Sequence, residues 1–203
     1  MERKIHFLSD QLTLAGLISE SSLENGVVIT HPHPLYGGDM FNPVVEAAQQ
    51  AFQSAGWTTL RFNFRGVGDS EGKFDNGTGE QTDIASAITF LTDLGIGVVD
   101  LVGYSFGAWV NSLINTQLRI HDLIMISPPV AFIRFDSKQP LSRLKQVITG
   151  SEDEIAPASM IQEMIPAWNP DAHSHIIDGA DHFYTGYLYK LRNIVRNALS
   201  TGA

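Results

Sequence analysis

The sequence predicts an α/β protein in which a mostly parallel sheet is covered by helices on both faces. Short apolar segments alternate along the chain with longer amphipathic segments, as strands alternate with helices. The chain has 203 residues, the length of one large domain, and 43% of them are hydrophobic, enough for a core on both sides of a sheet. We therefore expect a single domain over residues 1–203, with functional loops at the carboxyl ends of the strands.

The predicted elements follow in order along the chain. The strands are expected at 3–8, 12–18, 27–30, 57–62, 98–102, 122–127, 145–149 and 173–177. The helices are expected at 41–55, 79–94, from the 103–107 segment to 117, at 157–165 and at 184–199. The first two strands are expected to form a β-hairpin at one edge of the sheet, and residues 130–143 an irregular connection.

Residues 103–107, Gly-Tyr-Ser-Phe-Gly, form a G-x-S-x-G pentad between an apolar strand and a helix. Small residues two positions before and after Ser105 let strand and helix approach at a sharp turn without a Cβ clash. The hydroxyl then projects from the turn, and the free N–H groups at the start of the helix stabilise negative charge beside it. This arrangement predicts a serine nucleophile, with a purely structural tight turn as the alternative.

Composition argues against several other kinds of chemistry. A net charge of −9, a pI near 5.1 and only 13 Lys and Arg residues disfavour nucleic-acid or anionic-membrane binding. The chain has no cysteine, and so no disulfide, thiolate nucleophile or cysteine-based metal site. The N-terminus lacks the apolar region of a signal peptide and no stretch has membrane-spanning length, so we expect a cytoplasmic protein without a membrane span.

A serine hydroxyl attacks at neutral pH only when a histidine accepts its proton and an acid orients that histidine. Of the seven histidines, His182 lies in a small-residue loop after the last predicted strand, from which it can reach Ser105. The other six lie at or near strand starts, along a strand, or upstream of the serine. We therefore predict His182 as the general base, with an ordinary loop histidine as the alternative.

Asp153 is the predicted acid because it directly follows the predicted strand at 145–149, close to the strand that carries Ser105. The competing carboxylates lie in the same two loops: Glu152, Glu154, Asp178 and Asp181. Asp181 adjoins His182, and adjacent side chains generally point apart, while the two glutamates fit a solvated acidic turn.

The tetrahedral intermediate of acyl transfer carries an oxyanion that two backbone N–H groups must stabilise. The N–H of Phe106, directly after the nucleophile, is one predicted donor. The second is expected from residues 31–38, His-Pro-His-Pro-Leu-Tyr-Gly-Gly, a loop whose prolines and glycines break strand and helix. The prolines have no N–H, which leaves His33, Leu35 and Tyr36, and we favour Leu35.

A rigid turn is the alternative function for this loop. A metal site at His31 and His33 is disfavoured because no third ligand lies close in sequence. We expect neither a metal nor a cofactor.

The chain order Ser105, Asp153, His182, with the pentad between strand and helix, closely resembles the α/β-hydrolase superfamily over nearly the whole chain. More narrowly, residues 31–38 and 62–72, the latter Phe-Asn-Phe-Arg-Gly-Val-Gly-Asp-Ser-Glu-Gly, resemble a small branch without a cap that is related to dienelactone hydrolases. The resemblance implies a twisted, mainly parallel eight-stranded sheet with an antiparallel second strand, and hydrolysis of an ester-like bond through an acyl-enzyme. It also supports Leu35 as an oxyanion donor.

Dienelactone hydrolases proper use a cysteine nucleophile, which this chain lacks, so their lactone substrate is not carried over. Asn63 stands where many relatives of the wider superfamily have aspartate, and we expect Asn63, Arg65 and Asp69 to support the site structurally. Too few residues separate the predicted strands at 122–127 and 145–149 for a cap domain.

We therefore expect a serine hydrolase of carboxylesterase or thioesterase type that acts on a small to medium acyl substrate. Val130, Phe132, Ile133 and Phe135 are candidates for an open acyl or alcohol pocket, with ordinary packing as the alternative. The alternative functions are a serine peptidase or aminoacyl amide hydrolase, and a non-catalytic binding protein on the same fold. The presence of all three triad residues disfavours the binding protein.

Overall fold

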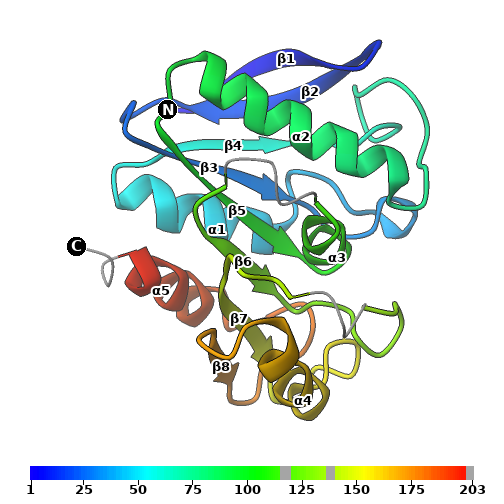
Figure 1. The fold of residues 1–203 in the computed structure, drawn as a ribbon, viewed down its shortest axis with the longest axis vertical. Coiled ribbons are helices and arrows are strands. Elements are labelled where there is room, and N and C mark those ends of the chain that lie inside the picture. Colours follow the sequence, from blue (N-terminus) through cyan, green and yellow to red (C-terminus); the bar gives the residue numbers. More distant parts are fainter. Residues whose placement is uncertain (115–119, 136–139, 200–203) are drawn as a thin grey trace.

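The computed structural model describes residues 1–114, 120–135 and 140–199. One twisted eight-stranded sheet runs through it in the order β1-β2-β4-β3-β5-β6-β7-β8 (Figure 1). The strands are β1 Arg3–Ser9, β2 Leu12–Ser19, β3 Asn25–Thr30, β4 Thr58–Phe62, β5 Val98–Tyr104, β6 Leu123–Ile126, β7 Leu144–Gly150 and β8 His173–Ile177. β2 is antiparallel to β1 and β4, and the other neighbouring pairs are parallel, so the predicted sheet is confirmed.

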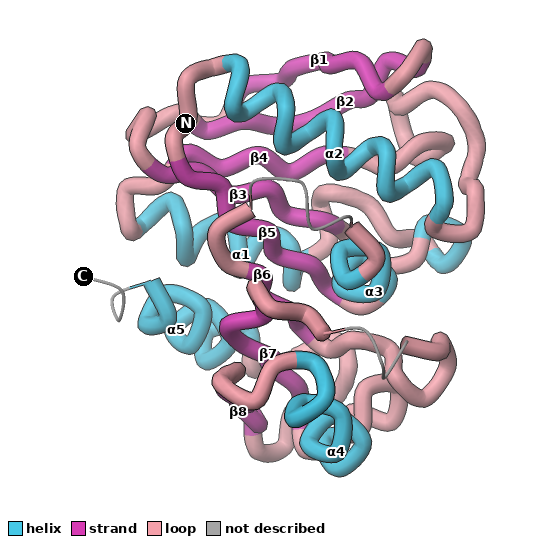
Figure 2. Tube along the Cα trace, viewed as in Figure 1, coloured by secondary structure: helices cyan, strands magenta, loops and turns pink. Residues whose placement is uncertain are grey.

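Helices cover both faces of this sheet (Figure 2). They are α1 Pro43–Ser54, α2 Thr78–Asp93, α3 Phe106–Ser112, α4 Ala158–Trp168 and α5 Leu188–Leu199, with one 3₁₀ turn, η1 Pro34–Tyr36. α2, α3 and α4 contribute to one apolar core, and α1 and α5 contribute to the core on the opposite face. Because both faces are covered, every residue of β4 and nearly every residue of β3 is buried.

The last helix is shorter than predicted. It begins at Leu188 rather than at residue 184, because Tyr184 and Gly186 adopt positive φ angles of 55° and 79° that a right-handed helix cannot contain. The turn that these residues form lies shortly after His182 in the chain.

Two other predicted segments also differ in detail. The helix predicted to continue to residue 117 ends at Ser112 in the described chain, and residues 115–119 lie outside the described residues. The loop at 31–38 contains η1, in which a proline occupies the first position, where its missing N–H has no consequence.

The connection between β6 and β7 contains only residues 127–143, and its described part has neither helix nor strand. Within the described residues, no cap domain therefore lies above the carboxyl edge of the sheet, as predicted. None of the helices in the described parts of the chain has the length and apolarity needed to cross a lipid bilayer.

Asp100 is a buried carboxylate near the amino end of β5, away from Ser105. Burial and the neighbouring carboxylate of Asp122 raise the pKa of Asp100 to about 6. Its Oδ1 accepts hydrogen bonds from the Asp122 N–H at 3.1 Å and from His121 Nδ1 at 3.2 Å. The three side chains lie close enough together to hold a metal ion, but Lys145 Nζ already lies 2.7 Å from Asp122 Oδ2 and supplies positive charge there.

Asp100→Asn is expected to raise the free energy of unfolding at pH 8 by about 1–3 kcal/mol. The folded protein holds the Asp100 proton more tightly than the unfolded chain does, so ionisation above pH 6 destabilises the fold. The gain should shrink as the pH falls from about 6 toward 4, as measured by urea unfolding. Exposed Asp93→Asn serves as the control, and a gain for Asp100→Asn that stays constant between pH 5 and 8 would contradict this account.

Candidate active site

Ser105 occupies a strained turn between β5 and α3. Its backbone adopts φ 54° and ψ −118°, outside the regions that L-residues usually populate. Its N–H donates to the carbonyl of Ile126 on the neighbouring strand at 2.9 Å. The side chain is therefore held at the carboxyl edge of the sheet.

Close backbone contacts require both glycines of the pentad. A Cβ on Gly103 would lie 2.5 Å from the backbone nitrogen of Ala108. A Cβ on Gly107 would lie 2.5 Å from Thr30 Oγ1 and 2.8 Å from the carbonyl oxygen of His31. The missing side chains thus let α3 pack directly on β5 and β3, which is the close approach predicted from the spacing.

The structure brings together Ser105, His182 and Asp153 from the loops after β5, β8 and β7. Ser105 Oγ lies 3.0 Å from His182 Nε2. His182 Nδ1 lies 2.9 Å from Asp153 Oδ2 and 3.0 Å from Oδ1. This is the connected geometry of a nucleophile, a base and an orienting acid.

The Asp153 carboxylate is buried but well supplied with donors. Its Oδ1 accepts the backbone N–H groups of Ile155 at 3.0 Å and Ala156 at 2.8 Å. Burial alone would raise the pKa of Asp153, but hydrogen bonds and charge from His182, and further hydrogen bonds from Ser127 and Ala156, hold it below its ordinary value. The carboxylate therefore stays ionised, as an acid that stabilises an imidazolium must.

Three residues that the sequence analysis missed brace this acid and base. Ser127 is fully buried, adopts a φ of 44°, donates to Asp153 and has its Oγ 2.7 Å from Tyr184 Oη. Tyr104 Oη donates to the carbonyl of His182 at 2.9 Å. Burial raises the pKa of both tyrosines, so both hydroxyls remain available as donors.

The two predicted oxyanion donors differ in outcome. Phe106 is the first residue of α3, and its N–H has no hydrogen-bond partner among the described residues. The Leu35 N–H instead donates to His33 Nδ1 at 3.2 Å, and the Leu35 side chain is exposed, so the choice of Leu35 is corrected. The Tyr36 N–H is also occupied, by the carbonyl of His33 at 3.1 Å. Of the three alternatives, His33 has an N–H that bonds to no described residue.

His31 fastens this loop to the one that follows β4. Its Nδ1 lies 2.7 Å from the carbonyl oxygen of Pro32, and its Nε2 accepts the N–H of Phe64 at 3.0 Å. Burial lowers the pKa of His31 to about 4, against a smaller opposing effect of the Pro32 hydrogen bond. Both ring nitrogens of the neutral side chain are used, so His31 has no nitrogen free for a metal.

The loop after β4 supports the site as predicted for two of its three residues. Asn63 Oδ1 accepts the N–H of Met40 at 2.8 Å, and Arg65 forms an ion pair with Asp83 at 2.8 Å. Asp69 is exposed, and its side chain has no hydrogen bond or ion pair with any described residue, so its expected supporting role is not seen.

A cavity of about 600 Å³ opens over Ser105. Phe132 and Ile133, two of the four predicted pocket residues, line it. Val130 and Phe135 are only 9% and 6% exposed and belong to the core, so ordinary packing applies to them.

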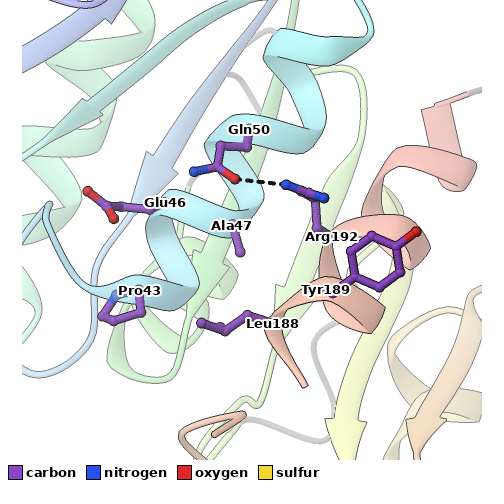
Figure 3. Close-up of a pocket in the computed structure, with 7 residues that line it drawn as sticks. All are labelled: Pro43, Glu46, Ala47, Gln50, Leu188, Tyr189 and Arg192. Atoms are coloured by element: carbon purple, nitrogen blue, oxygen red, sulfur yellow. Dashed lines mark hydrogen bonds between the residues drawn. The ribbon is translucent and has the colours of Figure 1, made fainter. Parts of the chain in front are cut away.

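A second, smaller cavity of about 200 Å³ lies between α1 and α5 (Figure 3). Gln50 and Arg192 face each other across it, with Arg192 Nη1 donating to Gln50 Oε1 at 3.1 Å. No triad residue lines this groove.

Comparison with solved structures identifies the family. A structure described as an alpha-beta serine hydrolase homologue from Coxiella burnetii is 30% identical, covers 97% of each chain and has a TM-score of 0.90. The chain belongs to the α/β serine hydrolase family. XC6422 from Xanthomonas campestris, a member of this family without a lid, is 28% identical over 98% of this chain and 94% of that chain, with a TM-score of 0.89.

Two other comparisons carry no information about family or function. The uncharacterized protein RP471 of Rickettsia prowazekii is 34% identical over 194 residues, 89% of this chain and 82% of that protein. No protein-family model matches the sequence. The predicted hydrolase family is confirmed, while the narrower relation to dienelactone hydrolases stays a prediction.

Ser127→Ala is expected to slow covalent labelling of the protein by a fluorophosphonate about three- to tenfold, because the Asp153 carboxylate loses one hydrogen bond. The readout is the second-order rate constant at pH 7. Ser112→Ala is the matched control, since this mostly buried hydroxyl donates to the Trp109 carbonyl at 2.6 Å and touches no triad residue. Equal rate constants for Ser127→Ala and Ser112→Ala would contradict a role of Ser127 in supporting the Asp153 carboxylate.

Proposed function

We propose that this protein is a serine hydrolase that cleaves an ester or thioester bond of a small to medium acyl substrate through an acyl-enzyme. The observation that carries the proposal is the continuous connection from Ser105 Oγ to His182 Nε2 at 3.0 Å and from His182 Nδ1 to Asp153 at 2.9 Å. A serine with these partners is activated for attack on a carbonyl carbon.

In the proposed acylation, His182 Nε2 takes the proton of Ser105 Oγ while that oxygen bonds to the carbonyl carbon. The carbonyl electrons move onto oxygen, and the N–H groups of Phe106 and His33 stabilise the oxyanion. The intermediate collapses by breaking the bond to the leaving oxygen or sulfur, which receives the proton from His182. Asp153 remains an anion throughout and stabilises the imidazolium.

Deacylation repeats these steps with water as the nucleophile. His182 takes a proton from water, the new hydroxyl bonds to the acyl carbon, and the bond to Ser105 Oγ breaks. Ser105 recovers its proton, and the carboxylic acid leaves.

The residues that line the cavity favour an uncharged organic substrate. None of the described residues that line it is Asp, Glu, Lys or Arg, and several, including Tyr36, Phe132 and Phe183, are aromatic. Est1E from Butyrivibrio proteoclasticus, whose structure has been solved with ferulic acid bound, shares the fold at 17% identity with a TM-score of 0.83. An aromatic acyl ester is therefore a reasonable first probe beside simple alkyl esters.

Ser105→Ala and His182→Ala are each expected to abolish labelling by a fluorescent fluorophosphonate and to lower kcat for a p-nitrophenyl acyl ester about a thousandfold or more. The probe reports an activated serine whatever the natural substrate is. Ser112→Ala should still be labelled. Full labelling of Ser105→Ala, or no labelling of the folded wild-type protein, would overturn the proposal.

Ester and amide substrates can be separated by direct comparison. The protein should hydrolyse p-nitrophenyl acyl esters with a kcat/KM well above that for aminoacyl p-nitroanilides. The reverse order would assign the same triad to a peptidase.

A further inference from the structure

The order of strands divides the cavity over Ser105 into two sides. β5, which carries Ser105, lies between β3 and β6. The loop after β3 supplies the cavity residues between Pro32 and Asn42, whereas the loops after β6, β7 and β8 supply those from Pro129 onward. A substrate bound at Ser105 therefore meets a different set of side chains in each direction.

The side formed after β6, β7 and β8 is apolar. Phe132, Ile133, Ile155 and Phe183 line it, and Phe132 and Phe183 are 75% and 65% exposed. Apart from the triad histidine, these loops present no hydrogen-bonding side chain to the cavity among the described residues. This side fits a hydrocarbon or aromatic group, which would cover the exposed rings.

On the opposite side the cavity is lined by Asn42, whose side-chain amide carries two N–H donors. Its Oδ1 accepts the N–H of Val44 at 2.9 Å and caps α1. Only the oxygen of the amide can accept this bond, so the orientation of the amide is fixed and Nδ2 is directed away from Val44. Nδ2 has no hydrogen bond to any described residue. Ser, Thr or Asp would cap the helix equally well, so the cap alone does not require an amide NH₂.

His33, which lines the same cavity as Ser105, also uses one polar atom as a local acceptor and keeps an N–H donor without a partner among the described residues. Its Nδ1 accepts the N–H of Leu35, so a neutral ring must carry its proton on Nε2. Three aromatic rings surround the imidazole, those of Tyr36, Phe74 and Phe106, with centroids 4.7 to 4.9 Å away. Burial lowers the pKa of His33, which favours this neutral form. Nε2 bonds to no described residue.

We propose that the cavity selects an ester with an apolar group on one side of the cleaved bond and an uncharged acceptor oxygen on the other. The side-chain N–H groups of Asn42 and His33 recognise that oxygen, which can be an ether, a hydroxyl or a second carbonyl. The inference rests on the proposed hydrolase function and goes beyond it by assigning the substrate class. Since neither donor carries a charge, recognition does not require an anionic substrate.

The test compares esters that differ only by an ether oxygen in place of a methylene group. One pair varies the alcohol, butyl against 2-methoxyethyl, and the other varies the acyl group, pentanoyl against 3-methoxypropanoyl. The readout is the ratio of kcat/KM for the ether ester to that for the alkyl ester. Comparing this ratio between wild type and variants cancels differences in intrinsic ester reactivity and in the reactivity of Ser105.

Asn42→Ser keeps an oxygen that can cap α1 but removes the donors, and we expect it to lower the ratio about three- to tenfold for one of the two pairs. Asn42→Asp also keeps the cap and should lower the ratio further, because a carboxylate repels an acceptor oxygen. Gln50→Glu is the control for Asn42→Asp: it adds the same negative charge, but within α1 in the groove that faces α5 rather than at the N-cap (Figure 3). This variant should leave the ratio unchanged.

The two levels of the hypothesis fail in different ways. The proposed substrate class alone is overturned if turnover depends on Ser105 but the kcat/KM ratio is the same in wild type, Asn42→Ser and Asn42→Asp for both ester pairs. Turnover that survives Ser105→Ala would overturn the hydrolase proposal and this inference with it.

Discussion

The backbone turn at Ser105 is the constraint on which the site depends. A non-glycine residue with φ 54° and ψ −118° is energetically unfavourable, and packing on both sides must hold it in place. Gly103 and Gly107 allow that packing, because α3 can then approach β5 and β3 to distances that a Cβ would prevent. The same turn places the serine hydroxyl and the free N–H of Phe106 at one edge of the sheet. A flatter turn would keep the strand and the helix but separate these two groups.

Strain is concentrated around the triad rather than spread over the chain. In the described residues, five non-glycine residues have positive φ. Three of them lie at the triad: Ser105 is its nucleophile, Ser127 bonds to Asp153, and Tyr184 bonds to Ser127. Ser127 and Tyr184 share a hydrogen bond of 2.7 Å, and Ser127 also bonds to Asp153, so two unusual backbone conformations meet at one buried contact. The hydroxyls of Ser127 and Tyr184 thus satisfy each other's hydrogen bonding, and the Asp153 carboxylate faces His182.

The sequence was sufficient for the fold and for the three residues that meet, because each carries a local signal. A pentad between strand and helix identifies Ser105, and small-residue or acidic loops after apolar segments identify His182 and Asp153. The second oxyanion donor could not be resolved this way. Eliminating the prolines left three N–H groups, and the hydrogen bond from Leu35 to the ring of His33 depends on a side-chain rotamer that no sequence pattern reports. Ser127 was missed for a similar reason, since a serine between a strand and two prolines resembles any other strand end.

The short connection between β6 and β7 has a kinetic consequence. An enzyme with a mobile cap must open to admit substrate and close before reaction, and such motions often limit turnover. With only residues 127–143 in this connection, the described residues contain no cap domain whose movement could limit turnover by the proposed enzyme. The described residues place no domain over the cavity, so part of a substrate of the proposed hydrolase can extend from it into water.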